Sequence, residues 1–412
     1  MEVVYTRCCG LDVHKQSVVA CTIVPGAARR PTKTIRTFGT TTDQLEALAE
    51  WLLAQKVTHA VMESTGVFWK PVFNILAGRI EVVVVNAQHV KVVPGRKTDV
   101  ADSEWLADLL RHGLLRASFI PDQAQRQLRD LTRTRVALID ERSRTIRRLH
   151  KVLEDANIKL SSVATDVLGV SGRAMLEALV AGTTDPHAMA DLAHGRLRAK
   201  LPALEQALTG RVSEHHRLLL KTHLAHIDFL NQAITQLSEQ VTECLRPFEA
   251  ELERLETIPG IKRRTAEVLA AETGLDMGRF PSAAHLASWA GMCPGNQESA
   301  GKRKTGKTRK GSKWLRRALV EAGRAAARKR GSSFFAQYRR LAARRGPNKA
   351  AVAVGHALLT TVYYVLARQD TYRGPDPVQQ EQHLRARTEK RALRQLQDLG
   401  YTVTLTPLAQ AA

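Results

Sequence analysis

A seven-residue repeat of apolar side chains constrains the fold of this chain more than any other feature. One row consists of Leu220, Ile227, Ile234, Val241 and Phe248, and a second of Leu230, Leu237 and Cys244, interrupted only by His223. Four such heptads predict a long helix in a coiled coil, with the Arg-rich segment 128–153 as its antiparallel partner or as a dimer arm. A plain helical hairpin within one chain is the alternative.

The positive charge is concentrated in one part of the chain. The 412 residues carry 62 Lys and Arg against 40 Asp and Glu, a formal net charge of +22. Seventeen of the basic residues and a single acid, Glu321, fall within 299–345. Because Trp314, Tyr338 and apolar residues at helical spacing are interleaved with them, we expect a folded segment that binds phosphates rather than a solvated tail.

Other classes of protein are excluded by pattern. The longest strongly apolar stretches, such as 80–85, fall far short of the roughly 18 to 20 residues that a membrane-spanning helix needs, and the N-terminus does not have the pattern of a secretory signal. None of the five cysteines forms a Cys-x-x-Cys pair. This usage is typical of a reduced cytoplasmic protein rather than a disulfide framework or a zinc site.

Residues 1–121 alternate strand-like and helix-like patterns. The expected strands are 3–11 and 18–24 as a hairpin, 36–38, 57–62 and 80–85. The expected helices pass through 45–52, follow Gly66, and cover 99–111. This α/β pattern resembles the ribonuclease H core.

The rest of the chain is predicted to be mainly helical. Residues 122–254 form the helical, coiled-coil segment, 255–370 a C-terminal domain, and 371–412 a charged helix and tail. The C-terminal domain opens with 255–261, a partial match to a helix-hairpin-helix in which Gly260 would let backbone N–H groups approach a phosphate. Lys262 stands where that pattern has its second glycine.

Four acids in the first domain stand out by position. Asp12 and Glu63 each end a predicted strand, and Asp99 and Asp102 share one helical face at a spacing of three. Any one of them alone is better explained as a cap or surface charge. As a set they would repel one another unless cations neutralised them, and two Mg²⁺ ions about 3.5 to 4 Å apart would suit phosphoryl transfer.

The motifs that hold these acids carry a family resemblance. In order they are GLDVHK, MESTG and KTDVAD, followed by the heptads and then by CPGNQESAGKRKTGKTRKG. This arrangement resembles the insertion-sequence 110 (IS110) family of transposases over nearly the whole chain. The resemblance implies a RuvC-like ribonuclease H domain with Asp12, Glu63, Asp99 and Asp102 as its catalytic metal ligands. It also implies a C-terminal transposase domain whose essential serine is Ser299.

The resemblance further implies site-specific recombination of donor and target double-stranded DNA in the bacterial cytoplasm, at the nucleoid. A structured bridge RNA would pair with both DNAs. Because two strand exchanges need at least two active sites, we expect a homo-oligomer, either a dimer or a tetramer, with the heptads as its contact. We expect no membrane partner.

The residues around Ser299 give a chemical reason for that assignment. A serine hydroxyl needs activation, and the phosphate that it attacks needs charge neutralisation. Gly301 permits close backbone approach, and the basic residues that follow it would hold the phosphate. We therefore expect Ser299 to form a phosphoserine link in a composite site with the Mg²⁺ ions. The two halves of that site can come from different subunits. The residues expected to bind nucleic acid are Gly260, Lys262, Arg263, Lys302, Arg303, Lys304, Lys307, Arg309, Lys310, Lys313, Arg316 and Arg317.

Three other side chains have simpler explanations. Ser312 is better explained as a helix N-cap before Trp314. His14, beside Asp12, is better explained as a polar turn residue than as a general base. Tyr338 lacks the Arg-His-Arg surroundings of a tyrosine-recombinase nucleophile.

Two other functions remain open from sequence. A metal-dependent, structure-selective nuclease, resembling Holliday-junction resolvases, would activate water and would not need Ser299. A basic architectural protein that binds nucleic acid would not cleave DNA at all.

Overall fold

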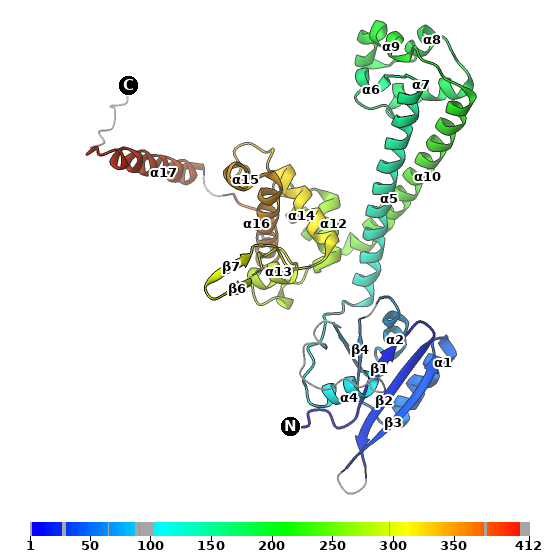
Figure 1. The fold of residues 1–412 in the computed structure, drawn as a ribbon, viewed down its shortest axis with the longest axis vertical. Coiled ribbons are helices and arrows are strands. Elements are labelled where there is room, and N and C mark those ends of the chain that lie inside the picture. The colour runs from blue at the N-terminus through cyan, green and yellow to red at the C-terminus, as the bar shows by residue number, and fades with distance from the viewer. Residues whose placement is uncertain are drawn as a thin grey trace. The chain divides into compact units, whose positions relative to one another are not determined.

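A computed structural model describes residues 2–26, 30–64, 66–86, 90, 102–295, 297–374 and 377–403 (Figure 1). For 297–299, 302–305, 377–385 and 387 it describes the backbone alone. The chain forms two compact units, Met1–Asp122 and Gln123–Ala412. The first is a mixed sheet with helices and the second is largely helical.

The first unit is built on a five-stranded sheet. Its strands are β1 (Cys8–Val13), β2 (Ser17–Pro25), β3 (Pro31–Gly39), β4 (His59–Glu63) and β5 (Glu81–Val85), in the spatial order β3-β2-β1-β4-β5. The first three strands pair antiparallel, and β1, β4 and β5 pair parallel. The parallel strands therefore end at the same edge, at the end of the sheet that carries Asp12 and Glu63.

Two strands differ from their predicted bounds. The first begins at Cys8 because the preceding residues turn away to the end of a helix, where Val4 N–H and Tyr5 N–H both donate to the Arg111 carbonyl oxygen. The third runs for nine residues instead of three. It is an edge strand rich in Thr, Lys and Arg, so the apolar alternation that would signal its length is weak.

Helices cover both faces of this sheet. α1 (Thr42–Ala54) and α2 (Trp69–Leu76) bury Leu45, Leu48 and Val72 against one face, together with the side chains of Cys9 and Leu11. On the other face, α4 (Asp102–Arg111) buries Leu106 and Leu110. Strand alternation assigns Cys8, Gly10 and Asp12 to the face of α4.

α4 approaches β1 closely at Gly10. A Cβ atom built on Gly10 would lie 2.0 Å from the Ser103 carbonyl oxygen and 2.5 Å from the Ala107 backbone nitrogen. Only a residue without a side chain fits here. The contact sets the first turns of α4 directly on the strand that carries Asp12 near its end.

We expect Gly10→Ala to destabilise the first unit by at least about 1–3 kcal/mol, because backbone atoms on both sides must move. Gly39→Ala is the matched control, since its Cβ would meet only the flexible Gln44 side chain at 3.2 Å. Denaturant unfolding of the two variants measures the difference. Equal stability of the two variants would contradict this packing.

The cysteines of the sheet are buried thiols. Burial raises the pKa of Cys8 to about 12 and that of Cys21 to about 11. Both therefore remain protonated at neutral pH. All five cysteines of the chain are free.

In the second unit, α5 (Gln123–Asp155) and α10 (Glu214–Leu245) pack along one another within one chain (Figure 1). The first predicted row is buried from Leu220 to Val241, but Phe248 is exposed. Cys244 is also exposed, and Leu245 is buried in its place. The second row therefore shifts by one residue as it follows the 3.6-residue turn of a straight helix.

Small helices close the distal end of this hairpin. They are α6 (Leu160–Val163), α7 (Val170–Ala181), α8 (Pro186–Ala190), the 3-10 helix η2 (Gly195–Lys200) and α9 (Leu201–Leu208). Leu160, Met175, Leu176 and Leu204 are completely buried there together with Leu220 of α10. This segment has a core of its own.

The C-terminal part surrounds one apolar helix. Its elements are η3 (Arg246–Phe248), α11 (Glu249–Glu256), α12 (Arg263–Thr273), η4 (Met277–Arg279), α13 (Ala283–Trp289), β6 (Gln297–Ser299), β7 (Lys302–Thr305), α14 (Lys313–Ala326), α15 (Ser333–Arg345), α16 (Pro347–Arg368) and α17 (Pro377–Asp398). α13, α14 and α15 all contact α16. By length and composition α16 could cross a membrane, so the prediction that every apolar stretch falls far short of a span is wrong for this helix, but half of its apolar window is buried in this unit. That burial is the pattern of a core helix.

Buried ion pairs join α5 to α12. Arg135 donates to Glu267 over 2.6 Å, with only 2% and 4% of their side chains exposed. Arg133 donates to both oxygens of Glu272, over 2.7 and 2.8 Å, and Ser312 adds a third hydrogen bond to that carboxylate. These contacts connect α5, α12 and the start of α14.

Candidate functional site

Asp12 and Glu63 lie side by side at the ends of two parallel strands. The register pairs Leu11 of β1 with Met62 of β4, so each acid is the next residue on its strand. Neighbouring strands lie about 4.7–4.9 Å apart, and residues at matching positions face the same side. Glu63 stands two residues after Val61 on β4, so both side chains lie on the same face of the sheet. Val61 is buried with Leu106 of α4, so both acids belong to the face that α4 covers.

The third acid, Asp102, is the first residue of α4. Ser103, the next residue of this helix, lies against Gly10 of β1. Gly10 stands two residues before Asp12, so the start of α4 lies close to Asp12 along the strand. Asp99 lies outside the described residues. Within the part of the chain that the structure describes, no three acidic, His or Cys side chains gather closely enough to hold a metal ion.

The side chain of Asp12 is about one-third exposed, and its Oδ2 lies 3.0 Å from His14 Nε2. His14 stands in the turn between β1 and β2, where its N–H donates to the Ser17 carbonyl oxygen. The ring is 60% exposed. This position agrees with the turn residue that the sequence predicts.

The donor set fits a hard divalent cation. Asp12 and Glu63 supply carboxylate oxygens from adjacent strands, on a side of the sheet that is only partly covered at this end. Mg²⁺ is held in proteins by one or two such carboxylates together with waters and substrate phosphates. The two acids could therefore begin a metal site.

Ser299 lies just before the tip of a two-stranded hairpin in the second unit. β6 and β7 pair antiparallel, with Ser299 opposite Lys302. The two turn residues between them, Ala300 and Gly301, have φ angles of 51° and 72°. Two positive φ angles define a type I′ turn. Ala300 is strained in that conformation, which costs a non-glycine residue about 1–2 kcal/mol.

This hairpin is the end of a longer arm, residues 291–311. Gly295 N–H donates to the Lys307 carbonyl oxygen over 2.7 Å, and Pro294 pairs with Thr308. At the base, a Cβ atom on Gly311 would lie 2.2 Å from the Ala290 carbonyl oxygen. The two ends of the arm can meet only because that side chain is absent.

The residues predicted to bind nucleic acid divide into two groups. Three of them already bind other groups of the protein. Arg316 donates to the Gly291 carbonyl oxygen and to Thr308. Arg317 pairs with Asp140 and Glu321, and Arg263 pairs with Glu249. The hydrogen bonds to Glu249 raise the pKa of Arg263. The second group is exposed and consists of Lys262, Lys307, Arg309, Lys310 and Lys313. The side chains of Lys302, Arg303 and Lys304 lie outside the described residues.

Several single residues have structural roles. A Cβ atom on Gly260 would lie 2.4 Å from the Ala322 carbonyl oxygen, so this glycine allows the turn before α12 to pack on α14. Ser312 is the N-cap of α14, as the sequence predicts, and its Oγ accepts from Leu315 N–H. Tyr338 packs against the core of the unit.

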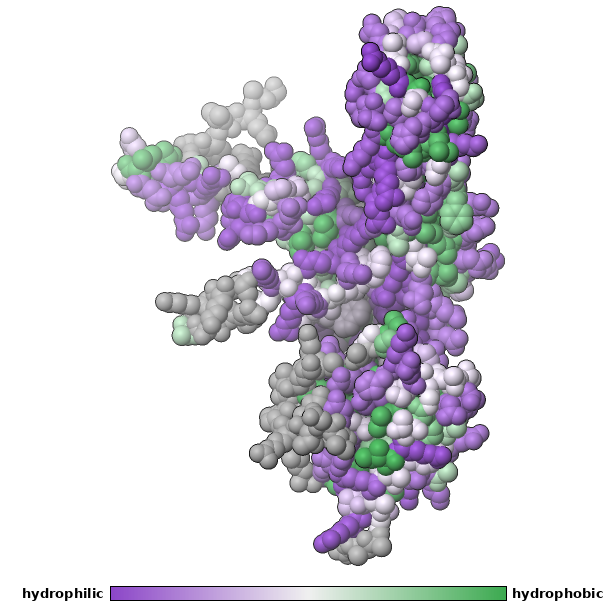
Figure 2. All heavy atoms as spheres, turned by 45° about the vertical axis from the view of Figure 1, so that its right-hand side comes forward, coloured by the Kyte–Doolittle hydropathy of each residue, from purple (hydrophilic) through white to green (hydrophobic). Residues whose placement is uncertain are grey.

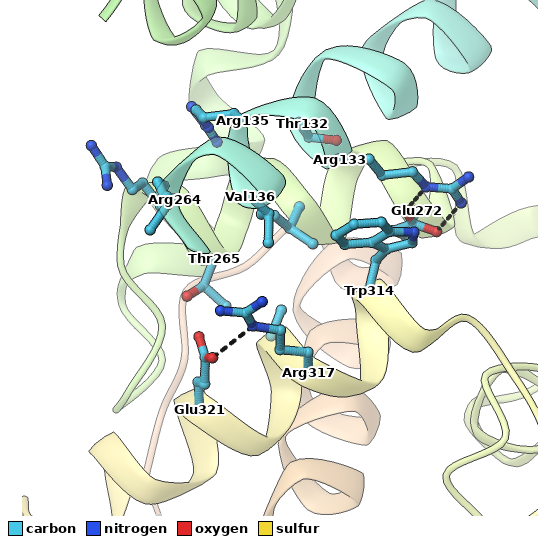
Figure 3. A pocket seen from close by; sticks show the side chains of 13 residues that line it. Thr132, Arg133, Arg135, Val136, Arg264, Thr265, Glu272, Trp314, Arg317 and Glu321 are labelled. Carbon is cyan, nitrogen blue, oxygen red and sulfur yellow. Dashed lines mark hydrogen bonds and ion pairs between the residues drawn. The ribbon is translucent and has the colours of Figure 1, made fainter. Parts of the chain in front are cut away.

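A pocket that the sequence analysis did not find lies where α5, α12 and α14 meet (Figure 3). Trp314 and Val136 are among its apolar walls, and Arg133, Arg264 and Arg317 are among its charged ones. The only sequence signal for it is a tryptophan at the head of the basic segment. Hydrophilic side chains predominate on the face of the molecule that Figure 2 shows.

Comparisons with known proteins match two regions of this chain to transposases. Residues 9–158 match the model of the DEDD transposase domain of IS110 elements, described as "Transposase". Residues 252–339 match the model described as "Transposase IS116/IS110/IS902 family". The chain is also similar to the transposase for insertion sequence element IS1111A of Coxiella burnetii, with 25% identity over 77% of this chain and 80% of that protein.

The two matched regions contain the strand-end acids and the serine hairpin, and they define an enzyme that recombines DNA, a transposase. The chain belongs to the IS110 family of insertion-sequence transposases. The resemblance predicted from the motifs is confirmed. The matched DEDD transposase domain also implies a divalent metal ion.

We expect Gly311→Ala to displace the arm that carries Ser299, because the new Cβ would meet backbone rather than a movable side chain. DNA cleavage should fall by at least about tenfold. Gly306→Ala, in the same arm with nothing within 4 Å of its Cβ, is the control and should cleave normally. Cleavage assays of the two purified variants, run in parallel, test this. Normal cleavage by Gly311→Ala would contradict the role of Gly311 in positioning the arm.

Proposed function

We propose that this transposase cuts and rejoins DNA through Ser299, with Mg²⁺ held by Asp12, Glu63, Asp99 and Asp102, in a ribonuclease H-like first unit. The observation that carries the proposal is the position of Asp12 and Glu63 directly after the paired residues Leu11 and Met62 on adjacent parallel strands. The strand order β3-β2-β1-β4-β5 supports a ribonuclease H fold. The family of the chain supports the chemistry.

In the proposed reaction, Ser299 Oγ attacks the phosphorus atom of a DNA phosphodiester. A phosphoserine bond forms as the bond to one deoxyribose oxygen breaks, and the serine proton is transferred to solvent or to a base while the departing oxygen gains one. A deoxyribose hydroxyl of the exchanged strand then attacks the phosphoserine and regenerates the free serine. Bound Mg²⁺ would supply charge neutralisation at phosphate oxygens.

The serine is supported by its place in the chain. It lies beside a strained type I′ turn, and strained backbone is concentrated at functional sites. The exposed cations Lys307, Arg309 and Lys310 follow it within the same arm. A phosphate beside the hairpin would therefore be near several positive charges.

The partners that we propose follow the resemblance of the motifs. They are donor and target double-stranded DNA, a structured bridge RNA that pairs with both, and further copies of this chain in a dimer or tetramer. The action is cytoplasmic, on the nucleoid. The basic segment 299–345 supports polyanionic partners, whose binding should weaken with rising salt.

Ser299→Ala should abolish strand cleavage and leave DNA binding unchanged, because only the attacking oxygen is removed. Ser332→Ala, at the N-cap of α15, is the control: it should cost about 0.5–2 kcal/mol of stability through the lost cap and still cleave. Gel assays with labelled DNA, with and without denaturation to trap a protein–DNA link, measure both. Undiminished cleavage by Ser299→Ala would favour the resolvase-like nuclease instead.

Asp12→Asn and Glu63→Gln should each lower Mg²⁺-dependent cleavage by at least about a hundredfold, because each removes a charged ligand. Glu81 is an exposed acid at the start of β5, at the end of the sheet away from Asp12 and Glu63. Glu81→Gln is therefore the control and should remain active. Cleavage is measured across a Mg²⁺ titration and after chelation with EDTA. If wild-type protein binds DNA but never cleaves it with any divalent cation, the chain acts as an architectural protein.

A further inference from the structure

The pocket between α5, α12 and α14 has the walls of a site for a flat aromatic group. It is a half-open cavity of about 200 Å³. Trp314 lies at one side, and the side chains of Val136, Ile139, Val268 and Ala318 supply the rest of its apolar lining. Figure 3 shows the indole directed towards Val136, with Arg264 at the opposite side of the pocket.

The walls of the pocket are fixed before any ligand binds. Arg133 is held by two hydrogen bonds to Glu272, and Arg317 by one to Glu321 (Figure 3). Arg317 also donates to Asp140. The hydrogen bonds from Arg317 also hold the pKa of Asp140 below its ordinary value. A site with fixed walls loses little conformational entropy on binding.

Two polar groups of the lining lack a partner within the described residues. Arg264 is exposed and makes no ion pair there, in contrast to the paired Arg133, Arg135 and Arg317. The Thr265 hydroxyl likewise makes no hydrogen bond with any described residue. Lys313 is exposed and lies outside the lining, with its Nζ over the Trp314 ring, 5.0 Å from the ring centre. The pocket therefore combines an apolar floor, an indole, a hydroxyl and one exposed cation, Arg264, with the exposed Lys313 beside the indole.

This combination fits a nucleobase with its flanking phosphates. Every base presents a flat face that stacks on an aromatic side chain, a polar edge for a hydroxyl, and a phosphate on either side for a cation. An apolar protein side chain would use the floor but neither Arg264 nor Lys313. A base within an intact duplex cannot enter, because its faces are already stacked.

Resting on the proposed function of binding polynucleotides, we propose that this pocket holds one unpaired nucleobase, stacked on Trp314. Arg264 and Lys313 contact the adjoining phosphates. The enzyme would thereby recognise a point where a strand leaves its duplex. The base belongs to DNA or to RNA, since both have the same stacking face.

The test measures binding of the full-length protein to a 30-base-pair duplex that is fully paired, that carries one bulged nucleotide, or that carries an abasic residue at the bulge. Each is made as DNA and as RNA. Wild-type protein should prefer the bulged base to the abasic bulge by about tenfold, within the roughly 5- to 150-fold range that base–aromatic stacking spans. Whether the preference occurs with the DNA duplexes or with the RNA duplexes identifies the bound strand as DNA or RNA.

Trp314→Leu should abolish the preference and leave binding of the paired duplex and its salt dependence unchanged, because stacking involves no counterion release. Trp314→Phe should restore most of the preference, which excludes misfolding as the cause. Trp289→Leu is the matched control, a partly exposed tryptophan of α13 outside the pocket, and should retain the preference.

Equal binding of bulged and abasic duplexes by wild-type protein, or an unchanged preference in Trp314→Leu, would overturn the pocket assignment while paired-duplex binding persists. Failure to bind even the paired duplex would overturn the proposed function and the pocket with it. The two failures are thus distinguishable in one set of titrations.

Discussion

Two buried carboxylates on α12 determine how the second unit is assembled. Glu267 and Glu272 are 4% and 1% exposed, and an ion buried to this degree is tolerated only where partners satisfy it. Arg135 and Arg133 of α5 provide those partners, and Ser312 at the start of α14 completes the set around Glu272. Because removing one partner of a buried pair costs about 3–5 kcal/mol, a slipped register of these helices is strongly disfavoured.

The position of the serine hairpin follows from the same contacts. Ser312 is both the hydrogen-bond donor to Glu272 and the residue directly after Gly311, at the base of the 291–311 arm. Arg316, one turn into α14, holds the Gly291 carbonyl oxygen at the other end of the arm. The buried network, the helix start and the arm are therefore one continuous structure. The position of the hairpin that carries Ser299 therefore depends on charges that are buried within the protein.

How far the sequence could predict this structure depended on the range of the interaction. Asp12 and Glu63 were predictable because a strand pattern and its last residue are local features, and parallel pairing then brought them together. The heptad row failed at Cys244 because a straight helix gradually departs from a seven-residue period. The roles of Gly10 and Gly311 could not be predicted from the sequence. At each position the backbone that excludes a side chain belongs to a segment distant in the sequence. The pocket at Trp314 requires three helices and was not visible in any one of them.

The distribution of charge also has a consequence for binding. Counted along the chain, 299–345 offers seventeen cations, but Arg316 and Arg317 are occupied by a carbonyl oxygen and by carboxylates of the protein. Arg263, just outside that segment, is paired in the same way. A phosphate contact releases counterions only if the cation was available beforehand, and the slope of affinity against salt counts such contacts. The slope should therefore be smaller than the sequence count suggests, because part of the basicity of this protein builds the fold.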